Sequence, residues 1–333
     1  MVSKGTVTAQ LLYEISSPAY VNPDVVSHFD TLKIEELEKD KVHVSGCRGS
    51  SPPKDHKVCI NLAGGFRNGM EIILTGLDIE EKAKVFTEVL FNSVGGQEQF
   101  DEVFIELQRT DKENPTTNEQ AMASLVISVK SSNQELVGRL FSAKIIELAL
   151  ANIPGFFAES GPKSSGPVII YWPALVDSKY ITEKVHIDDK EIEVMPTSQL
   201  DYEEIYYQRE PVSIDDVKIS DQKEIYFGDQ FGTRSGDKGG CANLGVWAKN
   251  SLSYSFLYNF LTIEKLKELL PDLSKYEIER FELPNIYSLN FYIHDILEDG
   301  VSSNNRKDGQ AKSLGEYLRV KKILVPDSIL MET

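Results

Sequence analysis

The sequence predicts an α+β protein in which a β-rich N-terminal extension precedes two regions with the same element order, β-α-β-β-α-β. Two observations support this class. Apolar runs bounded by Gly and Pro indicate short strands, and longer amphipathic stretches indicate helices between them. The apolar fraction of 41% and the charged fraction of 26% are ordinary for a globular chain.

The N-terminal extension begins with TVTAQLLYEI (residues 6–15), which predicts a short helix capped by Thr6 or Thr8. Strands are predicted after it at residues 32–37, 41–47 and 57–62. The helix carries apolar side chains that we expect to need a partner chain, namely Leu11, Leu12 and Ile15.

The first β-α-β-β-α-β region lies within residues 1–176. Its elements are strand 70–76, helix 79–91, strands 100–107 and 123–130, helix 134–152 and strand 167–172. This order is typical of the ferredoxin-like split βαβ unit. Residues 177–220 are acidic and only patchily apolar, and they predict a connector with one hairpin near residues 184–194.

The second region, residues 221–333, repeats the order and predicts a second ferredoxin-like unit. A short strand at 224–227 and a glycine-rich loop come first. The core elements are strand 242–248, helix 257–270, strands 276–283 and 287–294, helix 310–319 and strand 320–325.

Bulk charge limits the classes of partner. The 333 residues include 52 acidic and 35 basic side chains, a formal charge of −17. Such a chain repels phosphate backbones and anionic lipid surfaces, so we expect no nucleic-acid or membrane partner. No signal peptide or membrane span is recognised, and three cysteines match no disulfide framework or zinc motif. The expected location is cytoplasmic, and no cofactor or metal is predicted.

One glycine-rich stretch is a candidate anion-binding site. DQFGTRSGDKGGCANLG (residues 229–245) holds five glycines, one arginine, one lysine and two aspartates. Glycines let successive backbone N–H groups converge on an anion, and Lys238 or Arg234 would add positive charge. The alternative is a tight glycine hairpin with solvated charges, and composition alone leaves both open.

Topology favours a binding site. In a ferredoxin-like sheet the first and third strands are antiparallel neighbours, so the entry to strand 242–248 should lie beside the exit of strand 287–294. The helix predicted at 310–319 begins at the same edge, and a helix N-terminus attracts anions. We therefore predict an anion site with His294 as its acid–base residue. The predicted ligand-binding residues are Arg234, Gly236, Asp237, Lys238, Gly239, Gly240, Asn243, Asn290 and Gln310.

The same residues carry a family resemblance. RSGDKGGCANLGVWA (234–248), LPNIYSLNFYIHDIL (283–297) and QAKSLGEYLRV (310–320) resemble the C-terminal ferredoxin-like domain of the acyclic terpene utilisation (AtuA-like) family. TVTAQLLYEI, YVNPDVV, VHVSGCRGSSPP and ILTGLDIEEKAK are similar to the latter part of that family's large N-terminal domain. The family's glycine-rich opening segment has no counterpart, so we expect the chain to start inside that domain.

The resemblance implies a role beside pathways that degrade acyclic terpenoids, such as citronellol and geraniol, through acyl-CoA intermediates. The expected protein is an enzyme or enzyme subunit in catabolism of acyclic terpenoid or branched acids. Its ligand would be a small anion such as an acyl-CoA or a carboxylate, and it would form a homo-oligomer or bind a partner subunit. The alternative is a non-catalytic binding or assembly subunit, a truncated paralogue in an AtuA-like complex.

Overall fold

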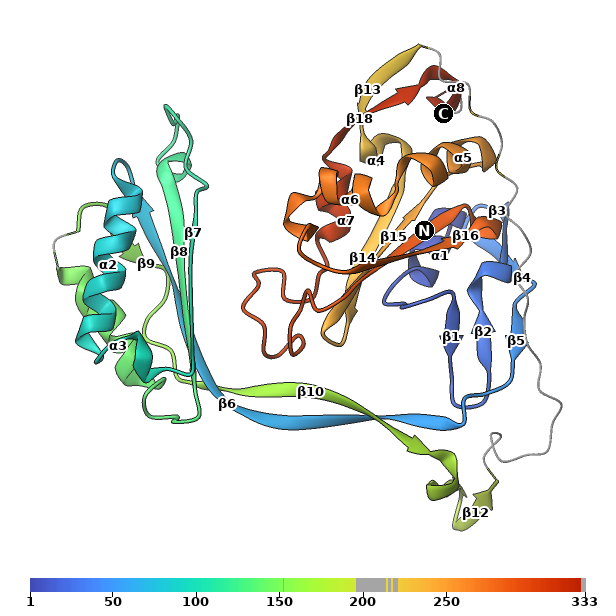
Figure 1. Cartoon of the computed structure of the whole chain (residues 1–333), viewed down its shortest axis with the longest axis horizontal. Helices are drawn as coiled ribbons and strands as arrows, with labels where there is room; N and C mark the ends of the chain where they lie inside the picture. The colour runs from blue at the N-terminus through green and yellow to red at the C-terminus, as the bar shows by residue number, and fades with distance from the viewer. Residues whose placement is uncertain (152, 196–213, 215–216, 218–220, 331–333) are drawn as a thin grey trace. The chain divides into compact units, whose positions relative to one another are not determined.

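The computed structural model describes residues 1–151, 153–195, 214, 217 and 221–330, and the chain packs as two compact units (Figure 1). The larger unit contains Met1–Ile60 and Tyr171–Thr333, and the smaller unit contains Asn61–Ile170. Both units combine helices with sheets, which confirms the α+β class. None of the helices in the described ranges combines the length and apolar character that a membrane span requires.

The smaller unit has the predicted ferredoxin-like topology. Its sheet order is β10-β6-β8-β7, which places the fourth strand beside the first and the third between the first and second. A short extra strand, β9, also pairs with β6. The elements are β6 (Asp55–Thr75), α2 (Ile79–Ser93), β7 (Glu102–Gln108), β8 (Met122–Ser131), α3 (Arg139–Glu147), β9 (Phe156–Ala158) and β10 (Gly166–Asp177).

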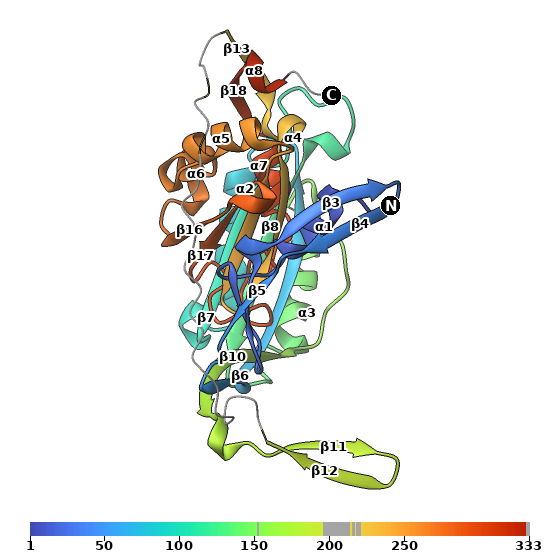
Figure 2. The same ribbon diagram turned by 90° about the vertical axis from the view of Figure 1, so that its right-hand side faces the viewer.

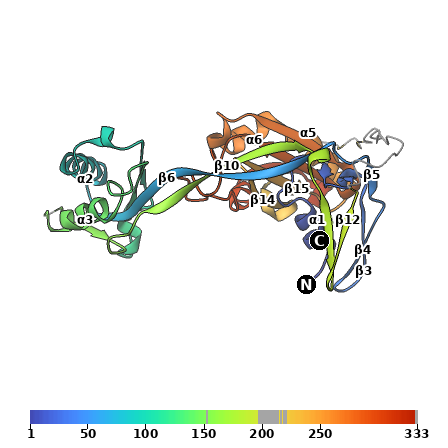
Figure 3. The same ribbon diagram turned by 90° about the horizontal axis from the view of Figure 1, so that it is seen from below.

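The core of the smaller unit follows from its apolar pattern. Alternate residues of β6 face the helices, including Met70, Ile72 and Leu74, all at most 2% exposed. The α2 residues Phe86 and Leu90, four apart, are both fully buried against them. Both helices therefore lie on one face of the sheet (Figures 1 and 3).

The C-terminal half of the larger unit contains a four-stranded sheet with the order β14-β15-β17-β16. Helices follow β15 and β17 as predicted, but the closing strand β18 pairs with β13 in a separate two-stranded sheet. The expected place of β18 beside β15 is taken by β14. The strands are β13 (Gln222–Tyr226), β14 (Gly232–Lys238), β15 (Cys241–Trp247), β16 (Ile278–Leu283), β17 (Ser288–Ile293) and β18 (Lys322–Pro326). The helices are α4 (Phe227–Gln230), α5 (Ser251–Phe260), α6 (Ile263–Leu269), α7 (Leu314–Arg319) and α8 (Asp327–Leu330).

The N-terminal residues pack within the larger unit. Helix α1 (Lys4–Leu11) is capped by Ser3, which accepts a hydrogen bond from the Thr6 amide, rather than by either predicted threonine. Leu12 and Ile15 are at most 1% exposed and join the core beside Leu283, and Leu11 packs against this core partly buried, so the apolar surface expected to need a partner chain is covered within this unit. The remaining strands are β1 (Ala19–Val21), β2 (Val26–His28), β3 (Lys33–Glu38), β4 (Lys41–Ser45) and β5 (Arg48–Ser50). Figure 2 shows β3 and β4 as a ribbon beside α1.

The predicted connector contains the expected hairpin, formed by β11 (Glu183–Ile187) and β12 (Lys190–Val194). Except for residues 214 and 217, positions 196–220 of the predicted connector lie outside the described residues.

Candidate functional site

Most predicted site residues lie on one face of the sheet β14-β15-β17-β16. The strand register pairs Gly236 with Asn243, and Gly245 with Asn290. Because side chains alternate along a strand, the opposite face carries Leu244 and the core beneath the helices. The predicted residues on the shared face are Arg234, Gly236 and Lys238 from β14, Asn243 from β15 and Asn290 from β17, with His294 directly after β17.

The two asparagines hold the N-terminal backbone rather than line a cavity. Both side chains are fully buried, and Asn243 Nδ2 donates to Asn290 Oδ1 at 2.9 Å and to the Leu12 carbonyl at 2.6 Å. Asn243 Oδ1 accepts from the Glu14 amide at 2.9 Å, and Asn290 Nδ2 donates to the Ser16 carbonyl at 2.8 Å. Because these amide groups are already paired, the prediction that both residues contact ligand is corrected: they form a latch for residues 12–16.

The glycine-rich loop is mostly a strand. A Cβ on Gly236 would approach Tyr13 Cε2 to 2.8 Å, and one on Gly245 would approach Leu12 Cβ to 2.6 Å. Real Cβ atoms do not come this close to other atoms. Gly236 therefore lets residues 12–14 lie directly on the sheet and is no part of an anion-binding loop.

Arg234 and Asp237 also serve this contact. The Arg234 guanidinium lies 4.2 Å from the centre of the Tyr13 ring. Lys312 Nζ donates to the Tyr13 hydroxyl and to Glu14 Oε1, and it lies 3.2 Å from Asp237 Oδ1. Burial opposes the charged forms, but these hydrogen bonds outweigh it, so the pKa of Lys312 is raised and the pKa of Glu14 is lowered. The cluster is an electrostatic clamp on the N-terminal segment.

Gln310 does not begin a helix. Helix α7 starts four residues later, and the carboxylate of Asp308 accepts hydrogen bonds from the amides of Lys312 and Ser313 at 2.8 and 2.9 Å. The place that a ligand anion would take is therefore filled by the chain's own carboxylate. The prediction for Gln310 as an anion-binding helix start is wrong.

The remaining glycines form the turn between β14 and β15. Gly239 has a φ of +67°, which favours glycine. The Leu297 amide donates to the Gly240 carbonyl at 2.8 Å, and a Cβ on Gly240 would lie against the Glu298 carbonyl. The structure thus brings the glycine turn and the exit of β17 together, as the topology predicted.

Two lysines meet at this turn. Burial, and then repulsion by Lys57, lower the pKa of Lys238 from its usual value, although the nearby carboxylates of Glu14 and Asp237 act in the opposite direction. Lys238 Nζ lies 5.4 Å from the centre of the Tyr20 ring, and Lys57 Nζ lies 5.4 Å from the centre of the Tyr171 ring. Neither lysine forms an ion pair with a carboxylate within the described ranges. This leaves a half-buried positive charge at the end of the sheet.

His294 lies at the same end of the sheet and has a defined partner. Its Nε2 lies 2.8 Å from Glu279 Oε1, and its ring packs edge-on against Tyr292 at 4.9 Å between centres. Burial, and then the interaction with the Cys241 thiol, raise the pKa of Tyr292. A histidine oriented by a carboxylate is suited to proton transfer.

Sequence reasoning missed four residues of this region: Lys57, Tyr171, Glu279 and Cys241. Cys241 and Glu279 follow from strand register, since Lys238 pairs with Cys241 and Glu279 pairs with Tyr292. A correct pairing of the predicted strands would have found them. Lys57 and Tyr171 come from β6 and β10, and no local motif links them to the glycine turn.

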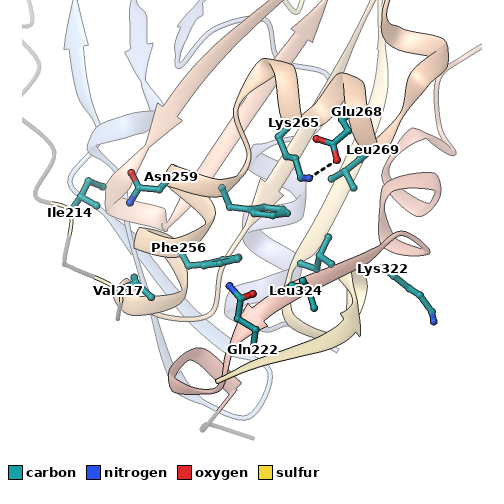
Figure 4. Close-up of a pocket in the computed structure, with 12 residues that line it drawn as sticks. Ile214, Val217, Gln222, Phe256, Asn259, Lys265, Glu268, Leu269, Lys322 and Leu324 are labelled. Atoms are coloured by element: carbon teal, nitrogen blue, oxygen red, sulfur yellow. Dashed lines mark hydrogen bonds and ion pairs between the residues drawn. The ribbon is translucent and has the colours of Figure 1, made fainter. Parts of the chain in front are cut away.

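A separate pocket of about 870 Å³ lies between α5, α6 and β18 (Figure 4). Phe256, Leu269 and Leu324 contribute apolar walls. Its lysines are already paired, Lys265 with Glu268 and Lys322 with Glu224, each at 2.7 Å. The pocket therefore has apolar volume and paired lysines, whereas Lys238 and Lys57 at the glycine turn form no ion pair in the described residues. No cluster of three or more metal-ligating side chains occurs in the described part of the chain.

Comparison with known families gives two matches. The model described as acyclic terpene utilisation family protein AtuA matches residues 1–187, which is more than half of the chain. The model described as AtuA ferredoxin-like domain matches residues 231–324. No curated protein and no solved structure gives a significant match.

Proposed function

Because the chain belongs to the acyclic terpene utilisation family, we propose that it acts on acyl-CoA intermediates in the catabolism of acyclic terpenoid or branched acids. The glycine turn with Lys238 and Lys57 would bind the anionic part of the ligand. His294 would be the acid–base residue, and Glu279 would orient it.

The observation that carries this proposal is the half-buried Lys238, which lies near a second lysine and forms no ion pair with any of the described residues. A desolvated cation gains most from an anion that takes the place of lost water. In a chain of net charge −17, such a local site is needed to attract an anionic ligand. A phosphate or the thioester oxygen of an acyl-CoA supplies the missing partner.

The catalytic half of the proposal rests on His294 and its neighbours. The strand register pairs Ala242 with Ile293, so Cys241 and His294 occupy the next positions on the two strands. His294 is therefore the neighbour of Cys241, which in turn pairs with Lys238 on the next strand. A ligand held by Lys238 would lie within reach of an imidazole whose Nε2 is already fixed by Glu279 at 2.8 Å. The arrangement suits proton transfer at a bound thioester.

Turnover of purified protein with citronellyl-CoA tests the proposal, with products followed by mass spectrometry. We expect His294→Gln to lower turnover more than binding, and Lys238→Ala to weaken binding by roughly 1–3 kcal/mol. His186→Gln is the matched histidine control, because His186 also lies beside a carboxylate, Glu191 Oε2 at 3.6 Å. Lys275→Ala is the matched lysine control, because Lys275 Nζ also lies over a tyrosine ring.

The alternative function is that of a non-catalytic binding or assembly subunit. Ligand-induced stabilisation that depends on Lys238, without turnover by any variant, would favour this alternative. Turnover that is equal in wild type and His294→Gln would remove His294 from the reaction. Binding that is unchanged in both Lys238→Ala and Lys57→Ala would contradict the proposed site itself.

A further inference from the structure

The hairpin β11–β12 has one apolar face and one charged face. Its register pairs Val185 with Ile192, Glu183 with Val194 and Ile187 with Lys190. Because alternate side chains share a face, all six of these residues project to the same side. Its four β-branched residues are 44%, 54%, 48% and 40% exposed, in the order Val185, Ile187, Ile192 and Val194.

The other face is fully polar. It carries Lys184, His186, Glu191 and Glu193, and Lys184 Nζ lies 2.6 Å from Glu191 Oε1. This face suits water, whereas the β-branched face has the composition of a sheet face that packs on a core.

Nothing in the described part of the chain covers the apolar face. β11 and β12 form a sheet of only two strands, visible as a separate ribbon in Figure 2. An isolated two-stranded hairpin is marginally stable in water and needs packing on one face. Every residue of β11 and β12 apart from Glu183 is nevertheless exposed.

Two charged residues at the ends of the apolar face indicate which partner packs on it. Glu183 lies at one end of the face and Lys190 at the other, with Val185 and Ile192 between them. Two identical hairpins stacked face to face with reversed strand direction place the Glu183 end of one against the Lys190 end of the other. The face is thus neutral and self-complementary, as a two-fold contact requires. This matters in a chain of net charge −17, whose copies otherwise repel each other.

We propose that two copies of this chain associate through the apolar faces of their β11–β12 hairpins, related by a two-fold axis. The contact forms a two-layered, four-stranded β structure with the β-branched side chains between the layers. It does not depend on the proposed acyl-CoA activity.

Sedimentation velocity over a range of protein concentrations tests this contact. We expect wild type to dimerise and Val185→Lys to dissociate at least about tenfold more readily, because a charge would enter the centre of the contact. Glu193→Lys is the matched control on the polar face of the same hairpin and should remain dimeric. Circular dichroism should be unchanged in both variants, because neither residue belongs to a core cluster.

A charge exchange separates a second copy from another partner. Glu183→Lys alone and Lys190→Glu alone should each weaken the dimer at low salt, because each puts like charges opposite each other. The double variant Glu183→Lys, Lys190→Glu should restore it. A wild type that is monomeric at high micromolar concentration, a dimer that tolerates Val185→Lys, or a double variant no better than the singles would each overturn the proposal.

Discussion

The buried asparagine latch makes a quantitative prediction for Asn243→Ala. The substitution removes three hydrogen bonds, at 2.6, 2.9 and 2.9 Å, to the Leu12 carbonyl, the Asn290 side chain and the Glu14 amide. Each contributes about 1 kcal/mol, and a buried partner left unpaired costs about 1–3 kcal/mol. The free energy of unfolding of the larger unit should therefore fall by roughly 3–4 kcal/mol.

Urea unfolding followed by tryptophan fluorescence measures this loss. Trp247 packs against the core that contains Leu12, whereas Trp172 is 55% exposed, so a Trp172→Phe background isolates the relevant signal. Asn259→Ala is the control, because that side chain makes a single hydrogen bond within the described ranges, to the Ser255 carbonyl at 2.9 Å. Its expected cost is about 1 kcal/mol. Equal unfolding midpoints for the two variants would show that the hydrogen bonds of Asn243 do not hold residues 12–16 in place.

Three further predictions concern the same unit. Gly245→Ala should cost about 1–3 kcal/mol in a thermal melt, because its Cβ would lie 2.6 Å from Leu12 Cβ. The control is Gly161→Ala in the smaller unit, which should be tolerated because a Cβ there would have no described atom within 4 Å. The stabilisation from Glu14, whose pKa is lowered, should be present above its usual value of 4.5 and lost as the pH falls through its folded value, so the difference between wild type and Glu14→Gln should shrink in acid urea titrations. A difference that grew in acid would contradict this. Lys238→Met should not lower the free energy of unfolding at neutral pH, because it removes a desolvated cation. In the wild type, affinity for an anionic ligand, measured by calorimetry, should fall as the pH rises through the lowered pKa of Lys238. An affinity that does not change with pH would count against a role for Lys238 in binding.

Local patterns predicted most elements because apolar residues repeat with the period typical of each strand or helix. The alternation in residues 70–74 places Met70, Ile72 and Leu74 on one face of β6, and β10 joins the same sheet. The closing strand β18 was misplaced, because β14 occupies the position beside β15. Strand β14 is rich in glycine, and because glycine favours turns, the sequence predicted a loop there.

The candidate site was harder to predict because its residues have long-range roles. Gly236 is needed for contact with Tyr13, and Asn290 bonds to the Ser16 carbonyl, more than 200 positions away in each case. Such contacts leave no mark in local composition. The start of β15 was correctly predicted to lie beside the end of β17, because strand order alone determines which strand ends are neighbours.

Hydrogen–deuterium exchange with and without citronellyl-CoA would show whether the ligand binds at the glycine turn, since it locates the ligand without requiring turnover. We expect slower exchange in the amides of residues 238–241 and 294–300 and in the segment around Lys57, and loss of this protection in Lys238→Ala. Protection confined to α5, α6 and β18, which line the apolar pocket, would contradict this expectation.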